Sequence, residues 1–309
     1  MAYVPKKSVP FVSEFKLREQ MCDIGRRIWT KGFCAGNEGN HSYRLGPDRI
    51  LCTPSLISKG NLKPDDMCIV DMEGKQISGK RKRTSEILLH LGIYKERADI
   101  KAVIHSHPPH ATAFAIADVE LPTCIHPEAE VFLGPVKTAK YVTPGDTRLP
   151  DSIKPYIKDS NTILLGNHGV VCYGSDLEDA YYKLEIVDAY ARILLLTKQL
   201  GSVRPLDADE MTDLLNLKSK FGMFDPRTAP GAKPEVQTCS GTDFVSRVRA
   251  EVGAKGMMAT ASGTTKAPAQ APQVGPMEQT LMSMIPDNFS EADVEQLVQT
   301  ITDQIMAAA

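Results

Sequence analysis

The sequence predicts an α/β fold for the larger part of this 309-residue chain, on two observations. From about residue 15 to residue 201, segments with helical spacing of apolar residues alternate with short runs rich in β-branched residues. The hydrophobic fraction of 42% and the charged fraction of 24% are ordinary for a globular protein, so the chain can bury a core. Together these observations indicate a domain built of both helices and strands.

Four helices are predicted where apolar residues recur every three or four positions. In the first of them, Leu17, Met21, Ile24 and Ile28 fall on one side. Gly201 ends the last one, as glycine often does after a helix C-terminus. The predicted helices span residues 15–30, 84–98, 111–117 and 177–200.

Five short strands are predicted from runs of β-branched and other apolar residues. Pro108 and Pro109 end the third strand, because proline has no N–H to donate to a sheet. The turn 166–169 separates the last two strands. The predicted strands span residues 49–53, 67–72, 100–107, 162–165 and 170–173.

The composition of the chain changes after residue 201. Residues 205–253 hold one or two further helical segments, and the next stretch is rich in Ala, Gly, Thr, Pro and Gln. Such a stretch buries too little apolar surface to offset its ordering entropy. We therefore predict a folded unit over residues 1–253, a flexible linker over 254–286 and a separate amphipathic helix over 287–309.

Charge and cysteine usage narrow the class of protein. The formal net charge of −2 gives no field that would draw the molecule to nucleic acid or to a membrane, despite the basic run Lys80–Arg83. No stretch approaches the ~20 apolar residues of a membrane-spanning helix. The seven cysteines are widely spaced and odd in number, which argues against disulfides and for a reducing cytoplasm. We expect a cytoplasmic protein.

A His-x-His motif at the end of the third strand is the sharpest local signal. Residues two apart on a strand face the same side, so His105 and His107 can converge on one ion. His168, in the glycine-flanked turn, offers a third imidazole. Three imidazoles with one open position are typical of catalytic zinc, although other divalent metals also bind imidazole. The alternative is two ordinary polar residues on a solvated strand face.

Glu86 is the candidate general base. It stands at the start of the second predicted helix, upstream of the histidines. A carboxylate near a metal-bound carbonyl is a natural base for the proton on the adjacent carbon. The alternative is a glutamate favoured at that place by the helix dipole alone.

These residues and their spacing resemble the signature of the class II aldolase/adducin family, in particular its fuculose-phosphate aldolase branch. Glu86 precedes His105 by 19 residues, and His107 precedes His168 by 61 residues. The resemblance covers about residues 15–201. It implies a three-layer α/β/α domain with a mostly antiparallel central sheet, Zn²⁺ as the cofactor and a homotetramer.

The resemblance also implies an activity. A ketose 1-phosphate, either L-fuculose 1-phosphate or L-rhamnulose 1-phosphate, would be cleaved to dihydroxyacetone phosphate and L-lactaldehyde. The metal would stabilise the enediolate that remains when the carbon–carbon bond breaks, and Glu86 would transfer its proton. Within the family, the alternatives are a ribulose-phosphate 4-epimerase or a methylthioribulose-phosphate dehydratase. The non-enzyme alternative is an adducin-like interaction protein, and the retention of Glu86 and all three histidines argues against it.

A second acid/base is expected to be a tyrosine, often supplied by a neighbouring subunit in the family. Tyr141, Tyr181, Tyr182 and other residues remain open for this role. The segment that holds His126, Glu128 and Glu130 either lines the site or is a polar surface loop.

The substrate phosphate is expected to bind where three short segments resemble the family's phosphate-binding corners. Glycine lets backbone amides approach an anion, hydroxyl and amide side chains donate to it, and a helix N-terminus favours it. Two residues depart from the family pattern: Glu38 stands where a small hydroxyl residue is common, and Leu56 where glycine is usual. The predicted contacts are Gly39, Asn40, Ser42, Thr53, Ser55, Thr84 and Ser85.

The C-terminal segment is predicted to be a docking helix. Ser290 is a good N-cap with Asp293 three residues on, and apolar residues then recur on one stripe. A linker followed by such a helix resembles the encapsulation peptides that direct enzymes into bacterial microcompartments. The resemblance implies shell proteins as partners and the lumen of a microcompartment as the location. The alternative is that the helix packs on its own domain. The apolar stripe is Val294, Leu297, Val298, Ile301 and Ile305.

Overall fold

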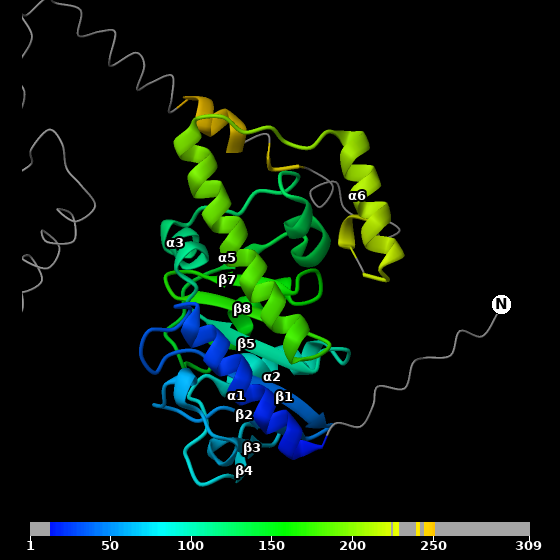
Figure 1. Ribbon diagram of the computed structural model, residues 1–309. Coiled ribbons are helices and arrows are strands. Elements are labelled where there is room, and N and C mark those ends of the chain that lie inside the picture. The colour runs from blue at the N-terminus through cyan, green and yellow to red at the C-terminus, as the bar shows by residue number, and fades with distance from the viewer. Residues whose placement is uncertain (1–12, 224, 229–238, 242–243, 251–309) are drawn as a thin grey trace, which may run out of the picture. The chain divides into compact units, whose positions relative to one another are not determined.

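A computed structural model describes residues 13–223, 225–228, 239–241 and 244–250 (Figure 1). Eight strands form one sheet in the order β4-β3-β2-β1-β5-β8-β7-β6. Every neighbouring pair is antiparallel except β6 and β7, so the expected mostly antiparallel sheet is confirmed. The strands are β1 Asn40–Gly46, β2 Arg49–Cys52, β3 Cys68–Val70, β4 Gln76–Ser78, β5 Ala102–Ser106, β6 Lys137–Ala139, β7 Thr162–Leu165 and β8 Gly169–Gly174.

Helices cover both faces of the sheet, which confirms the three-layer α/β/α architecture. Successive strand residues point to opposite faces, and the buried side chains of β5 follow this rule. Ala102 and Ile104 pack with α1, α3 and α5, whereas Val103 packs with α2 and α4. The helices are α1 Glu14–Thr30, α2 Ile87–Glu96, α3 Pro109–Ala117, α4 Leu149–Ile153, α5 Leu177–Leu200 and α6 Ala208–Lys220.

Two segments differ from the predicted secondary structure in ways that shape the site. The helix predicted from residue 84 begins only at Ile87, and Glu86 is its N-cap residue. Residues 40–46 form a strand, β1, that is absent from the five predicted strands. The sequence pattern does not predict this strand, because Asn40 and Ser42 are polar and buried strands are usually apolar. Both side chains are nevertheless buried and hydrogen bonded inside the domain.

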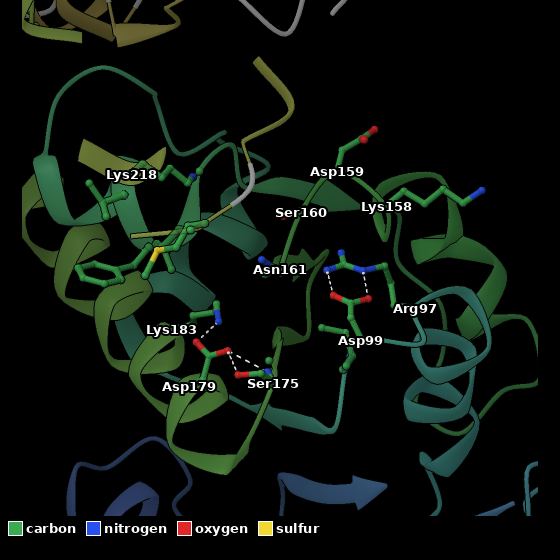
Figure 2. Close-up of a pocket in the computed structure, with 18 residues that line it drawn as sticks. Arg97, Asp99, Lys158, Asp159, Ser160, Asn161, Ser175, Asp179, Lys183 and Lys218 are labelled. Carbon is green, nitrogen blue, oxygen red and sulfur yellow. Dashed lines mark hydrogen bonds and ion pairs between the residues drawn. The ribbon is translucent and has the colours of Figure 1, made fainter. Parts of the chain in front are cut away.

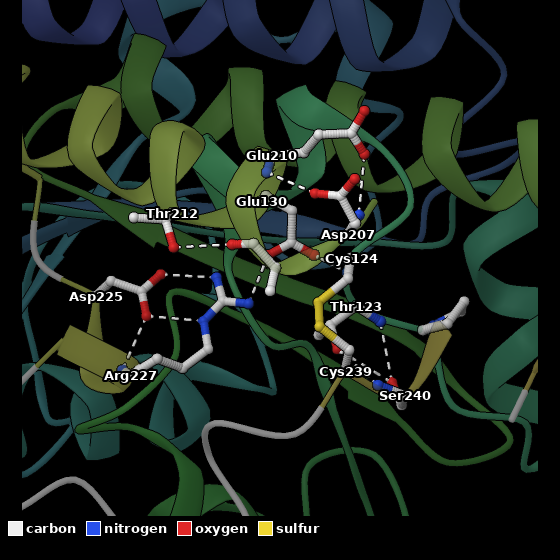
Figure 3. Close-up of a disulfide and its surroundings, with 12 residues drawn as sticks. Thr123, Cys124, Glu130, Asp207, Glu210, Thr212, Asp225, Arg227, Cys239 and Ser240 are labelled. Carbon is white, nitrogen blue, oxygen red and sulfur yellow. Dashed lines mark hydrogen bonds and ion pairs between the residues drawn. A yellow bond between two sulfur atoms is a disulfide. The ribbon is translucent and has the colours of Figure 1, made fainter. Parts of the chain in front are cut away.

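The helical segments predicted beyond residue 205 are confirmed as α6 and a helical stretch over 244–250. A disulfide between Cys124 and Cys239 ties this extension to the domain (Figure 3). The expectation that cysteines stay unpaired is therefore wrong for this pair, which lies 115 residues apart in sequence and 5.5 Å apart between Cα atoms. The other five cysteines are free and buried, as expected.

A cluster of four buried charges joins the extension to the single π-helical turn η3, Ala129–Leu133. Arg227 lies 2.6 Å from Glu130 and 2.9 Å from Asp225, and Lys218 lies 2.8 Å from Asp225 (Figure 3 shows the Arg227 pairs). Burial alone would raise the pKa of Asp225, but Arg227 and Lys218 lower it to about 2. Two acids and two bases thus neutralise one another inside the protein.

Several predicted features lie outside the described residues. They are the linker over 254–286, the helix over 287–309 with its N-cap Ser290, and the boundary of the folded unit at residue 253. In the part of the chain that the structure describes, no helix is both long and apolar enough to span a bilayer.

Candidate metal centre and active site

The three predicted histidines converge at one end of the sheet. His105 is the last residue but one of β5, His107 follows the end of that strand, and His168 occupies the turn between β7 and β8. The ring centroids are 4.5–5.0 Å apart, and one nitrogen of each ring lies within 4.8 Å of the others. Gly169 permits this approach, because a Cβ there would lie 2.5 Å from the His107 ring. The cluster could hold a metal ion.

All three imidazoles are held in the neutral form that binds metals. Burial, then the neighbouring His107, lowers the pKa of His105 to about 3. Burial and His105 lower the pKa of His168 to about 4, and burial also lowers that of His107. His105 Nδ1 lies 2.9 Å from the carbonyl of Val170. Because a carbonyl only accepts, Nδ1 carries the hydrogen and the lone pair on Nε2 faces the cluster.

Glu86 lies against this cluster. One carboxylate oxygen is 3.5 Å from His105 Nε2, and the other is 3.5 Å from His168 Nε2. Among the described residues, neither Glu86 Oε1 nor His168 Nδ1 has a hydrogen-bond partner, although both atoms are buried. Unpaired polar atoms are costly to bury, and a divalent cation among three neutral imidazoles would compensate the carboxylate charge. The residues present therefore fit a metal ion.

A cavity of about 470 Å³ opens over Glu86, His107 and His168. Five of the predicted phosphate contacts line it, and the structure thus brings them together with the metal cluster. Lys82 also lines the cavity, and it belongs to the basic run Lys80–Arg83 that directly precedes Thr84 in the sequence. Two predicted contacts, Ser42 and Thr53, are instead fully buried behind the wall. The five that line the cavity are Gly39, Asn40, Ser55, Thr84 and Ser85.

The two departures from the family pattern both border this cavity. The Glu38 carboxylate accepts hydrogen bonds from the backbone N–H groups of Ala35 and Gly36, so the Gly36 amide is not free for a phosphate. Partial burial would raise the pKa of Glu38, but these donors outweigh burial and lower it. Leu56 is 84% exposed with φ at +57°, a backbone conformation that favours glycine and marks local strain.

None of the three candidate tyrosines lines the cavity within the described residues. Tyr141 is exposed, and the Tyr181 hydroxyl is hydrogen bonded to Glu185. The segment with His126, Glu128 and Glu130 also lies elsewhere, and Glu130 belongs to the buried charge cluster.

A second cavity of about 420 Å³ lies at the opposite end of the same strands, beside Asp99 and Ser175 (Figure 2). Ala102 pairs with Gly174 at that end of β5, whereas Ser106 pairs with Val170 at the histidine end. Its charges are largely paired within the wall, Arg97 with Asp99 and Lys183 with Asp179. Among the described residues, potential metal ligands cluster only at His105, His107 and His168, so we place the candidate active site at the histidine cavity.

The fold and the site together define an α/β protein whose cavity lies against a histidine cluster that could hold a metal ion and against an adjoining carboxylate. Residues 19–195 match the Class II Aldolase and Adducin N-terminal domain. The chain belongs to the class II aldolase and adducin family.

Curated relatives of this chain include both aldolases and decarboxylases. It is 37% identical to the L-fuculose phosphate aldolase of Methanocaldococcus jannaschii, over 58% of this chain and 96% of that protein. It is 33% identical to the 5-deoxy-D-ribulose 1-phosphate aldolase of Bacillus thuringiensis, over 67% of this chain and 95% of that protein. It is 32% identical to the 3-oxo-tetronate 4-phosphate decarboxylase of Haemophilus influenzae, over 66% of this chain and 99% of that protein.

Solved structures show the same fold. The YgbL protein of Klebsiella pneumoniae superposes with a TM-score of 0.62 at 30% identity, over 66% of this chain and all of that one. An L-fuculose 1-phosphate aldolase superposes with a TM-score of 0.61 at 27% identity, over 67% of this chain and 96% of that one.

Proposed function

We propose that this protein is a lyase that uses a divalent metal, with zinc as its cofactor, to break a carbon–carbon bond in a phosphorylated ketose. The observation that carries the proposal is the placement of Glu86 within 3.5 Å of two of three converging neutral histidines, in one cavity. His105, His107 and His168 would hold the metal. When bound, the metal would act as a Lewis acid on the substrate's carbonyl and neighbouring hydroxyl.

Glu86 has the geometry of the proton-transfer group. Its Oε1 atom is buried but free of hydrogen bonds among the described residues, so it can accept a proton from a carbon held beside the cluster. Its N-cap position fixes the backbone at the start of α2. The carboxylate would take the proton from dihydroxyacetone phosphate in the condensation direction and return it in cleavage.

The cavity is suited to the substrate phosphate. Ser55, Thr84 and Ser85 bring hydroxyl groups to it, and Lys82 adds a positive charge. Gly39, with φ at +74°, lines the cavity with its backbone close to His105 and Ser106 of β5. These residues would hold the phosphate while the reacting carbons lie at Glu86. Asn40 also borders the cavity but has partners of its own, and Ser42 and Thr53 would act only from behind the wall.

For the substrate we propose L-fuculose 1-phosphate or L-rhamnulose 1-phosphate, cleaved to dihydroxyacetone phosphate and L-lactaldehyde. The fuculose-phosphate aldolases among the relatives support this choice, as does the fit of Glu86 and the histidines. A homotetramer with shared sites accords with the absence of a candidate tyrosine from the cavity wall in the described residues.

A second candidate is decarboxylation of a 3-oxo-tetronate 4-phosphate. It is favoured by the Haemophilus influenzae decarboxylase, which this chain matches over 99% of that protein's length, against 96% and 95% for the two aldolase relatives. Loss of CO₂ and loss of an aldehyde both leave an electron pair beside a carbonyl, so the same Glu86 could protonate the product.

One assay separates these candidates. The zinc-loaded protein is incubated with L-fuculose 1-phosphate, L-rhamnulose 1-phosphate, 5-deoxy-D-ribulose 1-phosphate and 3-oxo-tetronate 4-phosphate. Dihydroxyacetone phosphate and CO₂ are both measured. Release of dihydroxyacetone phosphate from the 6-deoxyhexulose phosphates supports the aldolase, and CO₂ release from the tetronate alone supports the decarboxylase. No turnover of any of them, with zinc bound, would refute the lyase.

We also propose that residues 287–309 dock to microcompartment shell proteins and that residues 254–286 act as the tether. The apolar stripe from Val294 to Ile305 supports this role, and so does the aldehyde product, which a shell would retain. A fluorescent protein fused to residues 277–309 should co-localise with shells. Diffuse fluorescence in shell-forming cells would contradict the docking role.

A further inference from the structure

The Glu86 carboxylate is held by one side-chain hydrogen bond. Asn40 Nδ2 donates to Glu86 Oε2 at 2.8 Å, and both residues are buried. Asn40 can do this only while its amide nitrogen, rather than its oxygen, faces Glu86. Turning the amide over would place its oxygen against the carboxylate, a contact of two acceptors.

His90 sets the orientation of the Asn40 amide. Its Nε2 lies 2.5 Å from Asn40 Oδ1, and the residue is fully buried in α2. Because an amide oxygen only accepts, His90 Nε2 must carry a hydrogen. Burial, and then His105 and His41, lower the pKa of His90 well below its ordinary value, so the ring is neutral and Nδ1 keeps its lone pair.

Two hydroxyl groups complete the chain behind His90. Ser42 Oγ lies 2.8 Å from His90 Nδ1 and 2.9 Å from the Tyr94 hydroxyl. The bare Nδ1 must accept, so Ser42 donates its one hydrogen to His90. The Tyr94 hydroxyl can donate its hydrogen to Ser42 or to the carbonyl of Lys101, which lies 3.3 Å away. From Ser42 through His90 and Asn40, each donor is therefore fixed in one direction, and Glu86 is the final acceptor.

We propose that His90, supported by Ser42, is a positioning residue that locks the Asn40 amide so that the Glu86 carboxylate is aimed at the histidine cluster. This role rests on the proposed function of Glu86 as the proton-transfer group. It also gives a role to Ser42, which lies outside the cavity, and to Asn40, whose side-chain amide has both its ends engaged. Within the described residues, His90 does not line the cavity, and its hydrogen bond to Asn40 links it to Glu86.

The kinetic test compares His90→Leu with His90→Gln in the zinc-loaded protein. The leucine variant removes the donor, whereas the glutamine amide can restore an N–H at the place of Nε2. We expect His90→Leu to lower kcat for proton exchange on dihydroxyacetone phosphate roughly 10- to 100-fold, with KM and zinc content unchanged. His90→Gln should recover most of the loss. Ser42→Ala, a smaller change, should show a weaker loss of the same kind.

His41→Leu is the matched control. His41 is also fully buried and lies in β1 between Asn40 and Ser42, but it points to the other face of the sheet, and its Nε2 lies 2.8 Å from the carbonyl of Met21 in α1. It should lower stability and leave kcat unchanged. Equal kcat losses in His90→Leu and His41→Leu would overturn the positioning role, because general destabilisation would explain both. Additive effects of Asn40→Ala and His90→Leu would also overturn it, since residues that act in series do not add.

A measurement that does not depend on enzyme activity separates this inference from the proposed function. Nitrogen-15 NMR of the imidazole groups should show His90 as the neutral Nε2–H tautomer, with its signal shifted in Asn40→Ala. A hydrogen on Nδ1 would overturn the inference whatever the enzyme does. If the tautomer is as expected but the wild-type protein exchanges no proton of dihydroxyacetone phosphate, the proposed function fails, and with it the role of His90 in aiming a base.

Discussion

At the scale of single residues, the first prediction concerns the histidine cluster as a metal site. His105→Ala should remove one of three ligands and lower zinc content from one per subunit to well below that, with the fold retained. Metal analysis after dialysis, alongside circular dichroism, measures both. His126→Ala is a fair control, because His126 lies away from the cavity. Full zinc content in His105→Ala would show that the cluster is not the metal site.

Glu86 can be tested separately from the metal. Glu86→Gln keeps the shape of the side chain and one oxygen that can accept the hydrogen bond from Asn40, but the amide cannot take a proton from the substrate. It should retain zinc while slowing solvent exchange of the dihydroxyacetone phosphate proton by roughly 10²- to 10⁴-fold. The exchange is followed by NMR in D₂O. Exchange at the wild-type rate would place the base elsewhere in the cavity.

Buried neutral histidines make stability depend on pH. Burial lowers the pKa of His41 from 6.5 to about 4, so the unfolded chain binds this proton more readily than the folded protein. Stability should then be complete above about pH 6.5 and fall as the pH drops toward 4. Urea unfolding of the metal-free protein at several pH values measures this. His41→Leu should reduce the slope of that fall, and an unchanged slope would show that His41 is not responsible.

At the scale of elements, the extension beyond the family domain is attached to that domain by buried ion pairs and by a disulfide. Arg227→Met should leave Glu130 and Asp225 without one of their cations, at a cost of about 3–5 kcal/mol in the free energy of unfolding. Denaturant unfolding checks this against Arg204→Met, which breaks an exposed pair with Glu210 and should change the stability far less because solvent screens that pair. Equal effects would mean that the buried cluster contributes no more than a surface pair.

The Cys124–Cys239 disulfide closes a long loop across the same extension. A double Cys124→Ala, Cys239→Ala variant should lose about 2–5 kcal/mol of stability, since the cross-link restricts the unfolded chain. Adding a reductant to the wild-type protein should reproduce the loss and have no effect on the variant. Reductant-insensitive stability in both would mean that the two thiols are not paired in solution.

At the scale of the whole molecule, the candidate site uses only residues of the family domain, 19–195. A chain that ends at residue 253 keeps that domain and the described extension. It should therefore remain folded, tetrameric and fully active, and lose only recruitment to shells. Gel filtration and the exchange assay test the first part. Loss of activity in this truncation would show that the C-terminal segment serves the site rather than packaging.

The sequence by itself determined the α/β class, most of the helices and the set of histidines with Glu86. Those signals are local: apolar spacing marks elements, and His105 and His107 fall on one side of a strand because of its two-residue period. The family resemblance supplied the sheet arrangement and the place of His168.

Only the tertiary structure decided what depends on contacts distant in sequence. Asn40 and Ser42 look like loop donors in the sequence, yet they pair with groups that lie 46–52 residues away. Cys124 and Cys239 look unpaired because their spacing in the chain carries no information about their distance in space. A buried polar side chain costs free energy unless it finds a partner, and which partner it finds is settled only when the layers pack.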